Sequence, residues 1–232
     1  MRGTILALAA VAALSHPQLA AAQPARAPTA ATETFRIDKA RIDKALADMV
    51  GSGRAVGVSA LVWRDGAERY FGAAGFADRE AKRGMSRDTI VQVYSMTKPV
   101  TGVALMQLWE QGRFGLDDPL SMYLPEYADV KVLADKAAKG EPVLRAPSRP
   151  ITVRDILRHT AGFTYGGGQT PADAAFRKID PLNIFQPLAE FGRRNARVPL
   201  LFDPGAEWSY SVAVDVQAVL VEKLSGQPFE TY

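Results

Sequence analysis

Residues 95–111 read SMTKPVTGVALMQLWEQ and join a Ser-x-x-Lys pair to a long apolar stretch. A serine and a lysine three residues apart on a helix lie on the same side, about one turn from each other. Pro99 cannot donate a backbone hydrogen bond to the Ser95 carbonyl, so it fits only the first turn, and the helix should begin close to Ser95. Apolar residues nearly all round this helix predict that it is buried. They are Val100, Val103, Ala104, Met106 and Leu108.

The Ser95–Lys98 pair indicates nucleophilic chemistry, because a nearby amine can take the proton of a serine hydroxyl. Burial and the positive end of the helix dipole would both lower the pKa of Lys98 and favour the neutral amine. The same helix end would offer the Ser95 backbone N–H to a developing oxyanion. A Ser-x-x-Lys pattern also arises by chance, but its place at the head of an apolar helix favours the functional interpretation.

Tyr210-Ser211 is a second candidate for chemistry. A phenol beside an amine can relay a proton to a leaving group. The alternative is an ordinary aromatic residue at the entry of the helix that follows, and spacing alone does not separate the two.

The rest of the chain predicts an α+β protein. Asp65-Gly66 predicts a hairpin turn within residues 56–74, where Val58, Ala60 and Val62 alternate with other residues. Thr152 with Asp155 forms a capping box that opens a short helix to about His159, with Gly162 as a left-handed stop. Segments 128–150 and 163–204 are rich in Pro, Gly and charge and are expected to be long excursions. Two more amphipathic helices are indicated by Ile42, Ala45, Leu46, Met49 and Val50 before Gly51, and by Val212, Val216, Val219, Leu220 and Leu224 before Gly226.

Residues 1–22 have the pattern of a secretory signal: Arg2, an apolar core over 4–15, and small residues at 20–22. A membrane anchor would need about 20 apolar residues. Residues 23–35 are Pro/Ala/Thr-rich and are expected to be a disordered lead-in, leaving 36–232 as the folded domain. We therefore expect a periplasmic or secreted protein with no membrane span once the signal is removed.

The composition of the chain limits the kinds of partner and cofactor that we expect it to bind. The chain has no cysteine and a formal net charge of +3, with scattered Lys and Arg, so nothing indicates a nucleic-acid surface. With one histidine beyond the signal, His159, a zinc site is not expected, and no cofactor is indicated. A Ser-His-Asp triad would have to use His159. Asp117-Asp118 before Pro119 fits the start of another helix better than a carboxylate pair.

Four segments occur in the order of one family. They are SMTKPVTG (95–102), LDDPLSMYLPE (116–126), ITVRDILRHTAGF (151–163) and PGAEWSYSVAVDV (204–216). The chain from about residue 36 resembles the serine β-lactamase and penicillin-binding-protein superfamily, and most of all the family VIII carboxylesterases and class C β-lactamase-related hydrolases.

The resemblance implies an antiparallel sheet flanked by helices, with a helical lobe in the middle of the chain. It implies Ser95 as the acylated nucleophile, Lys98 as its base and Tyr210 as a proton relay, and it places Ser211 and Val212 at the substrate. The implied substrate is a small-molecule ester or a β-lactam-like compound, and no cofactor is implied.

Two departures shape the expected function. Class C β-lactamases typically carry Asn where this chain has Val212, which favours ester cleavage over β-lactam turnover. The third motif of the family, Lys-Thr-Gly or a variant, does not occur, so we expect a C-terminally incomplete form of a longer protein. The leading hypothesis is an exported serine hydrolase that cleaves carboxylic esters. The alternatives are β-lactamase or D-Ala-D-Ala carboxypeptidase activity, and a non-catalytic fragment or binding protein.

Overall fold

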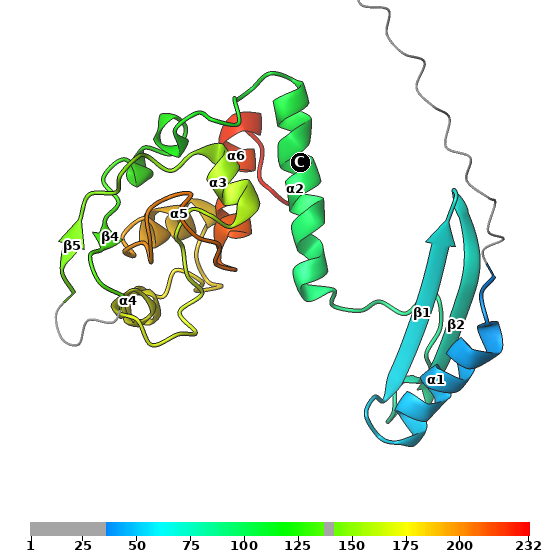
Figure 1. Ribbon diagram of the computed structural model, residues 1–232. Coiled ribbons are helices and arrows are strands. Elements are labelled where there is room, and N and C mark those ends of the chain that lie inside the picture. Colours follow the sequence, from blue (N-terminus) through cyan, green and yellow to red (C-terminus); the bar gives the residue numbers. More distant parts are fainter. Residues whose placement is uncertain (1–35, 137–141) are drawn as a thin grey trace, which may run out of the picture. The chain divides into compact units, whose positions relative to one another are not determined.

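The computed structural model describes residues 36–136 and 142–232 (Figure 1). The expected signal at 1–22 and lead-in at 23–35 lie outside the described residues. The chain forms two compact units, here called unit 1 (up to Ile90) and unit 2 (Val91–Tyr232), and each is described by itself. Among the described residues, no helix is both long and apolar enough to cross a membrane.

Unit 1 is one helix on an antiparallel sheet. Asp65 (φ 53°) and Gly66 (φ 70°) form the turn between its two long strands, and such two-residue hairpin turns need positive φ at both positions. The predicted hairpin is confirmed. The elements are α1 (Lys39–Gly51), β1 (Gly57–Arg64), β2 (Ala67–Asp78) and β3 (Arg83–Gly84), with the strands in the order β1-β2-β3.

The alternation predicted for β1 is also confirmed, since Val58, Ala60 and Val62 are half-buried whereas Leu61 and Trp63 are exposed. The first predicted helix is α1, which begins after Asp38 and ends at the expected Gly51. α1 packs on β2, where the Tyr70 hydroxyl donates a hydrogen bond of 2.7 Å to Asp43. Unit 1 is therefore built from local signals plus the packing of α1 on β1 and β2.

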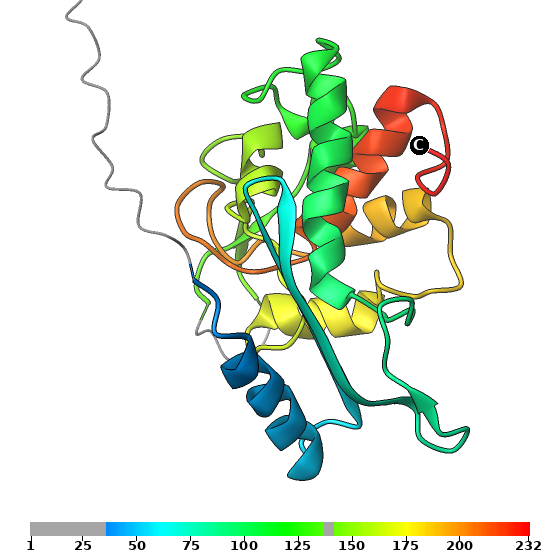
Figure 2. The same ribbon diagram turned by 90° about the vertical axis from the view of Figure 1, so that its right-hand side faces the viewer.

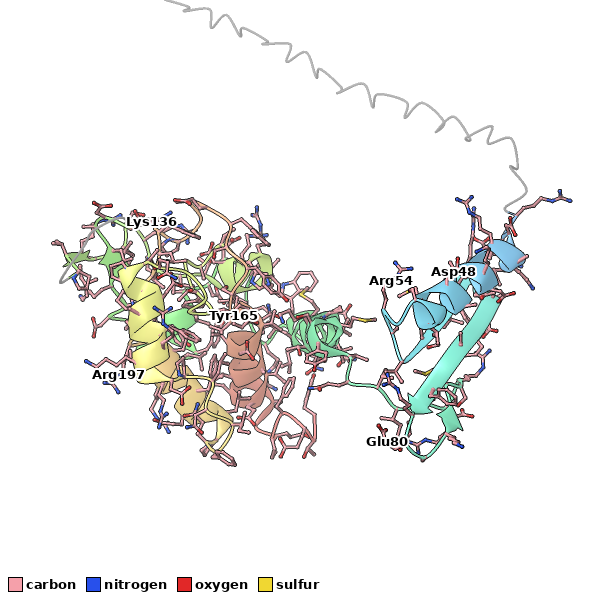
Figure 3. The ribbon with its side chains drawn as sticks, turned by 90° about the horizontal axis from the view of Figure 1, so that it is seen from below. Asp48, Arg54, Glu80, Lys136, Tyr165 and Arg197 are labelled. Atoms are coloured by element: carbon pink, nitrogen blue, oxygen red, sulfur yellow. The ribbon has the colours of Figure 1, made fainter. Side chains whose placement is uncertain are left out.

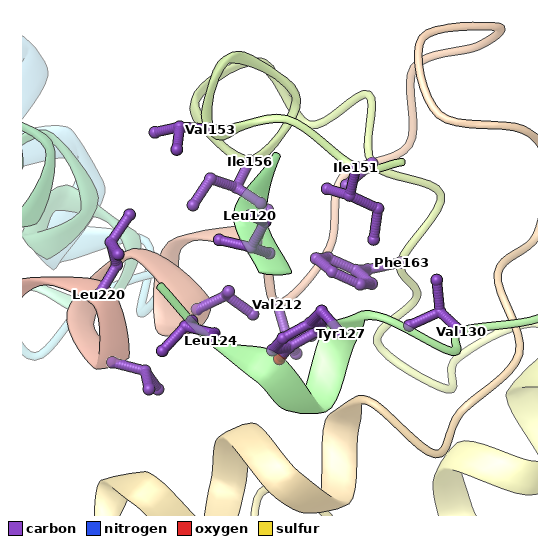
Figure 4. Close-up of a cluster of buried hydrophobic side chains, with 14 of the residues drawn as sticks. Leu120, Leu124, Tyr127, Val130, Ile151, Val153, Ile156, Phe163, Val212 and Leu220 are labelled. Carbon is purple, nitrogen blue, oxygen red and sulfur yellow. The ribbon is translucent and has the colours of Figure 1, made fainter. Parts of the chain in front are cut away.

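Unit 2 is mainly helical and holds the larger core (Figure 4). The excursion predicted over 163–204 was wrong in part, because two helices lie within it. The signal for the first of them is a capping box, Thr170 with Asp173, and Pro171 at the first helical position. The helices and strands of unit 2 are α2 (Thr97–Glu110), β4 (Val132–Leu133), β5 (Leu144–Arg145), α3 (Val153–Arg158), α4 (Pro171–Ile179), α5 (Leu188–Asn195) and α6 (Ala213–Ser225). Short 3-10 turns cover Tyr94–Met96, Leu120–Met122 and Pro125–Tyr127.

Helix α2 was predicted to begin close to Ser95 and to be buried on all sides. It begins at Thr97, directly after the turn that carries Ser95, so the predicted start is nearly right. Within unit 2, α2 packs mainly along one side, against α6, and the residues buried there are Thr101, Leu105 and Leu108. Unit 2 by itself leaves Val100 and Val103 uncovered, so the prediction of an all-round buried helix stays a prediction.

Of the other predicted helix ends, some are confirmed and some are corrected by the structure. The capping box of Thr152 and Asp155 opens α3 as predicted. The left-handed residue that ends α3 is His159 (φ 58°) rather than Gly162, although Gly162 also has positive φ. Helix α6 ends at Gly226 as predicted. Asp117 and Asp118 precede the 3-10 turn at Leu120–Met122 and not an α-helix, which corrects that expectation.

Candidate active site

Ser95 and Lys98 lie at the head of α2 with their functional atoms together. Lys98 Nζ donates a hydrogen bond of 3.2 Å to Ser95 Oγ. The residue before the serine, Tyr94, has φ 46°, a left-handed conformation that costs a bulky side chain about 1 kcal/mol or more. Backbone strain of this kind is concentrated at functional sites, and no spacing in the sequence announces it.

Tyr210 completes the constellation from a segment 115 residues away. Its hydroxyl donates a hydrogen bond of 2.8 Å to Ser95 Oγ. Lys98 Nζ lies 5.1 Å from the centre of the Tyr210 ring and 5.8 Å from that of Tyr165. The two aromatic rings are themselves 5.6 Å apart. The structure thus brings together Ser95, Lys98 and Tyr210 and adds Tyr165, which sequence reasoning missed because nothing in its spacing points to Lys98.

Ser211 and Val212 are placed differently from the other three. Their exposed fractions are 1% and 0%, so both side chains lie inside unit 2. Ser211 Oγ is 3.3 Å from His159 Nδ1. The assignment of these two residues to substrate binding stays a prediction. The imidazole of His159 is bonded to Ser211 and not to Ser95, which is the arrangement of a structural histidine rather than a triad base.

The pKa of Lys98 shifts in the direction opposite to the one expected. Burial lowers the pKa of Lys98, but its contacts with the Tyr210 and Tyr165 hydroxyls outweigh burial, and the pKa is raised overall. The predicted lowering was therefore wrong, because it counted desolvation and the helix dipole but not the two phenols. The hydrogen bond with Ser95, and then the contact with Lys98, lower the pKa of Tyr210. The two shifts share a cause, since the contact between the Lys98 amine and the Tyr210 phenol favours the charged form of each group.

A cavity of about 500 Å³ opens beside Tyr210. Its wall includes four aromatic side chains, Tyr165, Phe202, Trp208 and Tyr210, and an ion pair of 2.5 Å between Lys136 and Glu207. Figure 3 shows the side chains of Tyr165 and Lys136 as sticks. Aromatic walls with a few polar groups are typical of small-molecule sites. Among residues 36–136 and 142–232, no three His, Cys, Asp or Glu side chains are grouped so that they could hold a metal ion.

A serine hydroxyl held between a lysine amine and a phenol, at the head of a helix, is typical of the β-lactamase and penicillin-binding class of serine enzymes. The family model described as Beta-lactamase matches residues 42–232, and the chain therefore belongs to that family. Its fold is the β-lactamase/transpeptidase-like fold, with helices and antiparallel sheets.

Individual relatives agree with this assignment. The chain is 37% identical over 180 residues to esterase EstB of Burkholderia gladioli, a match that covers 75% of this chain and 42% of the relative. A solved structure described as EstCE1, a hydrolase with promiscuous acyltransferase activity, superposes with a TM-score of 0.70 at 33% identity. That match covers 83% of this chain and 48% of EstCE1.

A second solved structure, the unliganded simvastatin synthase (LovD) of Aspergillus terreus, gives a TM-score of 0.69 at 26% identity. It is covered over 51% of its length, and this chain over 85%. The chain thus spans about half the length of the relatives that it matches.

Proposed function

We propose that this chain belongs to an exported serine hydrolase that cleaves small carboxylic esters through an acyl-enzyme on Ser95. The observation that carries the proposal is the convergence on Ser95 Oγ of Lys98 Nζ at 3.2 Å and the Tyr210 hydroxyl at 2.8 Å. Both distances are within the reach of a general base on its proton. A strained residue directly before the serine supports the same conclusion.

The reaction follows from these contacts. Ser95 Oγ attacks the ester carbonyl carbon while its proton passes to the Lys98–Tyr210 pair, and the Ser95 backbone N–H supports the oxyanion. The bond to the alcohol oxygen then breaks, and Tyr210 returns the proton to that oxygen. Water attacks the acyl-enzyme in the same manner, which releases the acid and restores the serine hydroxyl. The contacts with Ser95 and Lys98 lower the pKa of Tyr210, which makes its phenol a stronger proton donor to the leaving oxygen.

Two observations support an ester rather than a β-lactam as substrate. Val212 offers no side-chain amide to a β-lactam, and the esterase EstB and the hydrolase EstCE1 are among the relatives. The cavity beside Tyr210 has room and an apolar wall for the acyl or alcohol group of a small ester. Export, to the periplasm or the medium, rests on the signal-like pattern of residues 1–22.

Acyl transfer is a second candidate, supported by the acyltransferase activity in the description of EstCE1. It differs only in the last step, in which an alcohol rather than water takes the acyl group from Ser95. Product analysis of an ester reaction with and without an added alcohol separates the two, since only transfer yields a new ester.

Labelling with a fluorophosphonate, followed by intact mass, tests the nucleophile. We expect one adduct on the chain, none on Ser95→Ala, and an unchanged adduct on Ser225→Ala, a serine outside the site. Hydrolysis of a nitrophenyl ester and of a chromogenic β-lactam then assigns the substrate class. An adduct that persists in Ser95→Ala would overturn the assignment of the nucleophile. A folded chain with no adduct would overturn the proposal for this chain and favour a non-catalytic role.

A further inference from the structure

His159, at the end of α3, makes hydrogen bonds with the residues on either side of Tyr210. Its backbone carbonyl accepts a hydrogen bond of 3.0 Å from the Ser209 N–H. Its ring atom Nδ1 accepts a hydrogen bond of 3.3 Å from the Ser211 N–H and lies 3.3 Å from Ser211 Oγ. One residue therefore holds the backbone immediately before and immediately after the phenol.

The imidazole also packs on the phenol itself. The ring centres of His159 and Tyr210 are 5.0 Å apart at an interplanar angle of 34°, and the Trp208 ring lies 6.1 Å from His159 at 65°. The other end of the Tyr210 side chain donates to Ser95 Oγ. The phenol is thus fixed at its ring by His159 and at its hydroxyl by the serine.

The hydrogen bonds define the protonation state of His159. A backbone N–H only donates, so Nδ1 must be unprotonated and the ring proton must be on Nε2. Burial, and then the charge of Lys98, lower the pKa of His159, which keeps the ring neutral. The groups that face it are Lys98 from the head of α2, Tyr210, and Asp155 of α3, whose carbonyl accepts the His159 N–H.

The backbone of His159 is itself fixed. Its φ of 58° is a left-handed conformation that Gly and Asn adopt most readily. Next to it, the Thr160 hydroxyl donates a hydrogen bond of 3.0 Å to Asp155, a carboxylate that also caps α3 and pairs with Arg149. The ring is therefore presented to Tyr210 from a rigid helix end.

We propose that His159 is a positioning residue that, as a neutral imidazole, holds the Tyr210 hydroxyl against Ser95. This inference rests on the proposed function, in which Tyr210 moves the proton. Protonation of Nδ1 would replace the acceptor by a donor facing the Ser211 N–H, so the segment that carries Tyr210 would be released. In this role His159 contacts neither Ser95 nor the reacting atoms of the substrate.

Two substitutions separate the acceptor from the backbone requirement. His159→Gly keeps the left-handed backbone and removes the ring, whereas His159→Asn keeps the backbone and an oxygen close to the place of Nδ1. We expect His159→Gly to slow fluorophosphonate labelling by about 10- to 100-fold, the range that misplacing a catalytic group costs. We expect His159→Asn to recover most of that loss. Asp180→Gly, at the left-handed end of α4, is the matched control and should label like the parent chain.

The pH dependence gives a readout that a merely structural role would not change. As the pH falls below the lowered pKa of His159, the labelling rate of the parent chain should gain a second acid limb, in addition to the limb of the Lys98–Tyr210 pair. His159→Asn cannot titrate there and should show only the first limb. A parent chain and an Asn variant with identical pH profiles would overturn the inference, as would a folded His159→Gly variant that labels at the parent rate.

Amide NMR tests the contact without using activity. The Ser211 amide signal of the parent chain should move with the titration of the His159 ring, and this movement should be lost in His159→Asn. If the Ser211 amide signal does not move while the imidazole titrates, the inference is overturned even if labelling is normal. A chain that is not labelled at all would overturn the proposed function, while the NMR titration would still decide whether His159 holds this segment.

Discussion

The two halves of the site lie at the starts of helices α2 and α6, and these two helices are packed differently within unit 2. They lie side by side in unit 2 (Figures 1 and 2) and are both rich in apolar residues. Within unit 2, helix α6 is almost wholly buried, whereas α2 buries Thr101, Leu105 and Leu108 and has Val100 and Val103 on a side that unit 2 does not cover. The difference arises because α6 contacts α2, α3 and α5, while within unit 2 α2 packs mainly against α6.

This difference teaches that the two halves of the site are fixed by different means. Tyr210 precedes a helix held in the core, so its backbone is placed by packing and by His159. Ser95 lies in an exposed turn, and its hydroxyl is placed by hydrogen bonds to Lys98 and Tyr210. Stability should therefore respond to changes around α6, and site electrostatics to changes at the head of α2.

The largest effect is expected at Asp155, in α3, the helix that packs against α6 and ends at His159. Arg149 donates two hydrogen bonds to this buried carboxylate, and the Thr152 and Thr160 hydroxyls donate as well. Breaking a buried ion pair from one side costs about 3 kcal/mol or more. We therefore expect Asp155→Asn to lower the free energy of unfolding by about 3 kcal/mol, measured by urea denaturation at neutral pH.

The pH dependence of that loss has a defined sign. Burial alone would raise the pKa of Asp155, but Arg149 and the Thr152 and Thr160 contacts lower it below 3.8 overall. The ionised carboxylate therefore stabilises the protein above pH 3.8, and this contribution is lost as the pH falls through the lowered value. Asp117→Asn, at an exposed carboxylate paired with Arg154, is the control and should have a much smaller effect. Equal losses in the two variants would contradict the prediction.

A matched pair of valines compares the two helices directly. Val216 of α6 is fully buried, whereas Val100 of α2 is 68% exposed. We expect Val216→Ala to cost about 2 kcal/mol from lost burial and the cavity left behind. Val100→Ala should stay within about 0.5 kcal/mol of the parent chain. Comparable losses by denaturant unfolding would show that the Val100 side of α2 is covered in solution.

A pair of glutamines makes a smaller version of the same comparison. Gln217 of α6 is buried and donates a hydrogen bond of 2.8 Å to the Ile156 carbonyl of α3. Replacing it by Ala leaves that buried carbonyl without its donor, at a cost of about 1–2 kcal/mol. Gln107, on the exposed side of α2, should be replaceable by Ala with almost no change in unfolding free energy. If Gln217→Ala also leaves the free energy of unfolding unchanged, the hydrogen bond between α6 and α3 makes no measurable contribution to stability.

The smallest changes are expected in ionisation at the head of α2. Because the Tyr210 hydroxyl raises the pKa of Lys98, Tyr210→Phe should lower it, as followed by NMR of the lysine side chain. Lys98→Met should raise the pKa of Tyr210, as followed by phenolate absorbance, although the hydrogen bond to Ser95 remains. Tyr123→Phe, which removes a phenol bonded to Asp118, is the control and should leave the pKa of Lys98 unchanged. Shifts in the opposite directions would contradict the coupling of Lys98 and Tyr210.

Much of the fold could be predicted wherever the signal is local. The Asp65-Gly66 turn and the capping box of Thr152 and Asp155 depend on a few neighbouring residues, and both were right. Helices α4 and α5 were missed because Pro, Gly and charge in 163–204 outweighed the short capping signal at Thr170. The apolar pattern of α2 predicts burial but does not say which element covers each side, and unit 2 by itself covers mainly the side that packs against α6.

The sequence by itself determined the Ser95–Lys98 pair, since a spacing of three residues across the 3-10 turn and the start of α2 brings the two side chains together. Only the tertiary structure decided that Tyr210 reaches Ser95, that two phenols reverse the expected shift in the pKa of Lys98, and that His159 brackets Tyr210. These contacts join residues that are between 50 positions (His159 and Ser209) and 115 positions (Ser95 and Tyr210) apart. Local periodicity carries no information about such pairs, because the packing of α2, α3 and α6 brings them together.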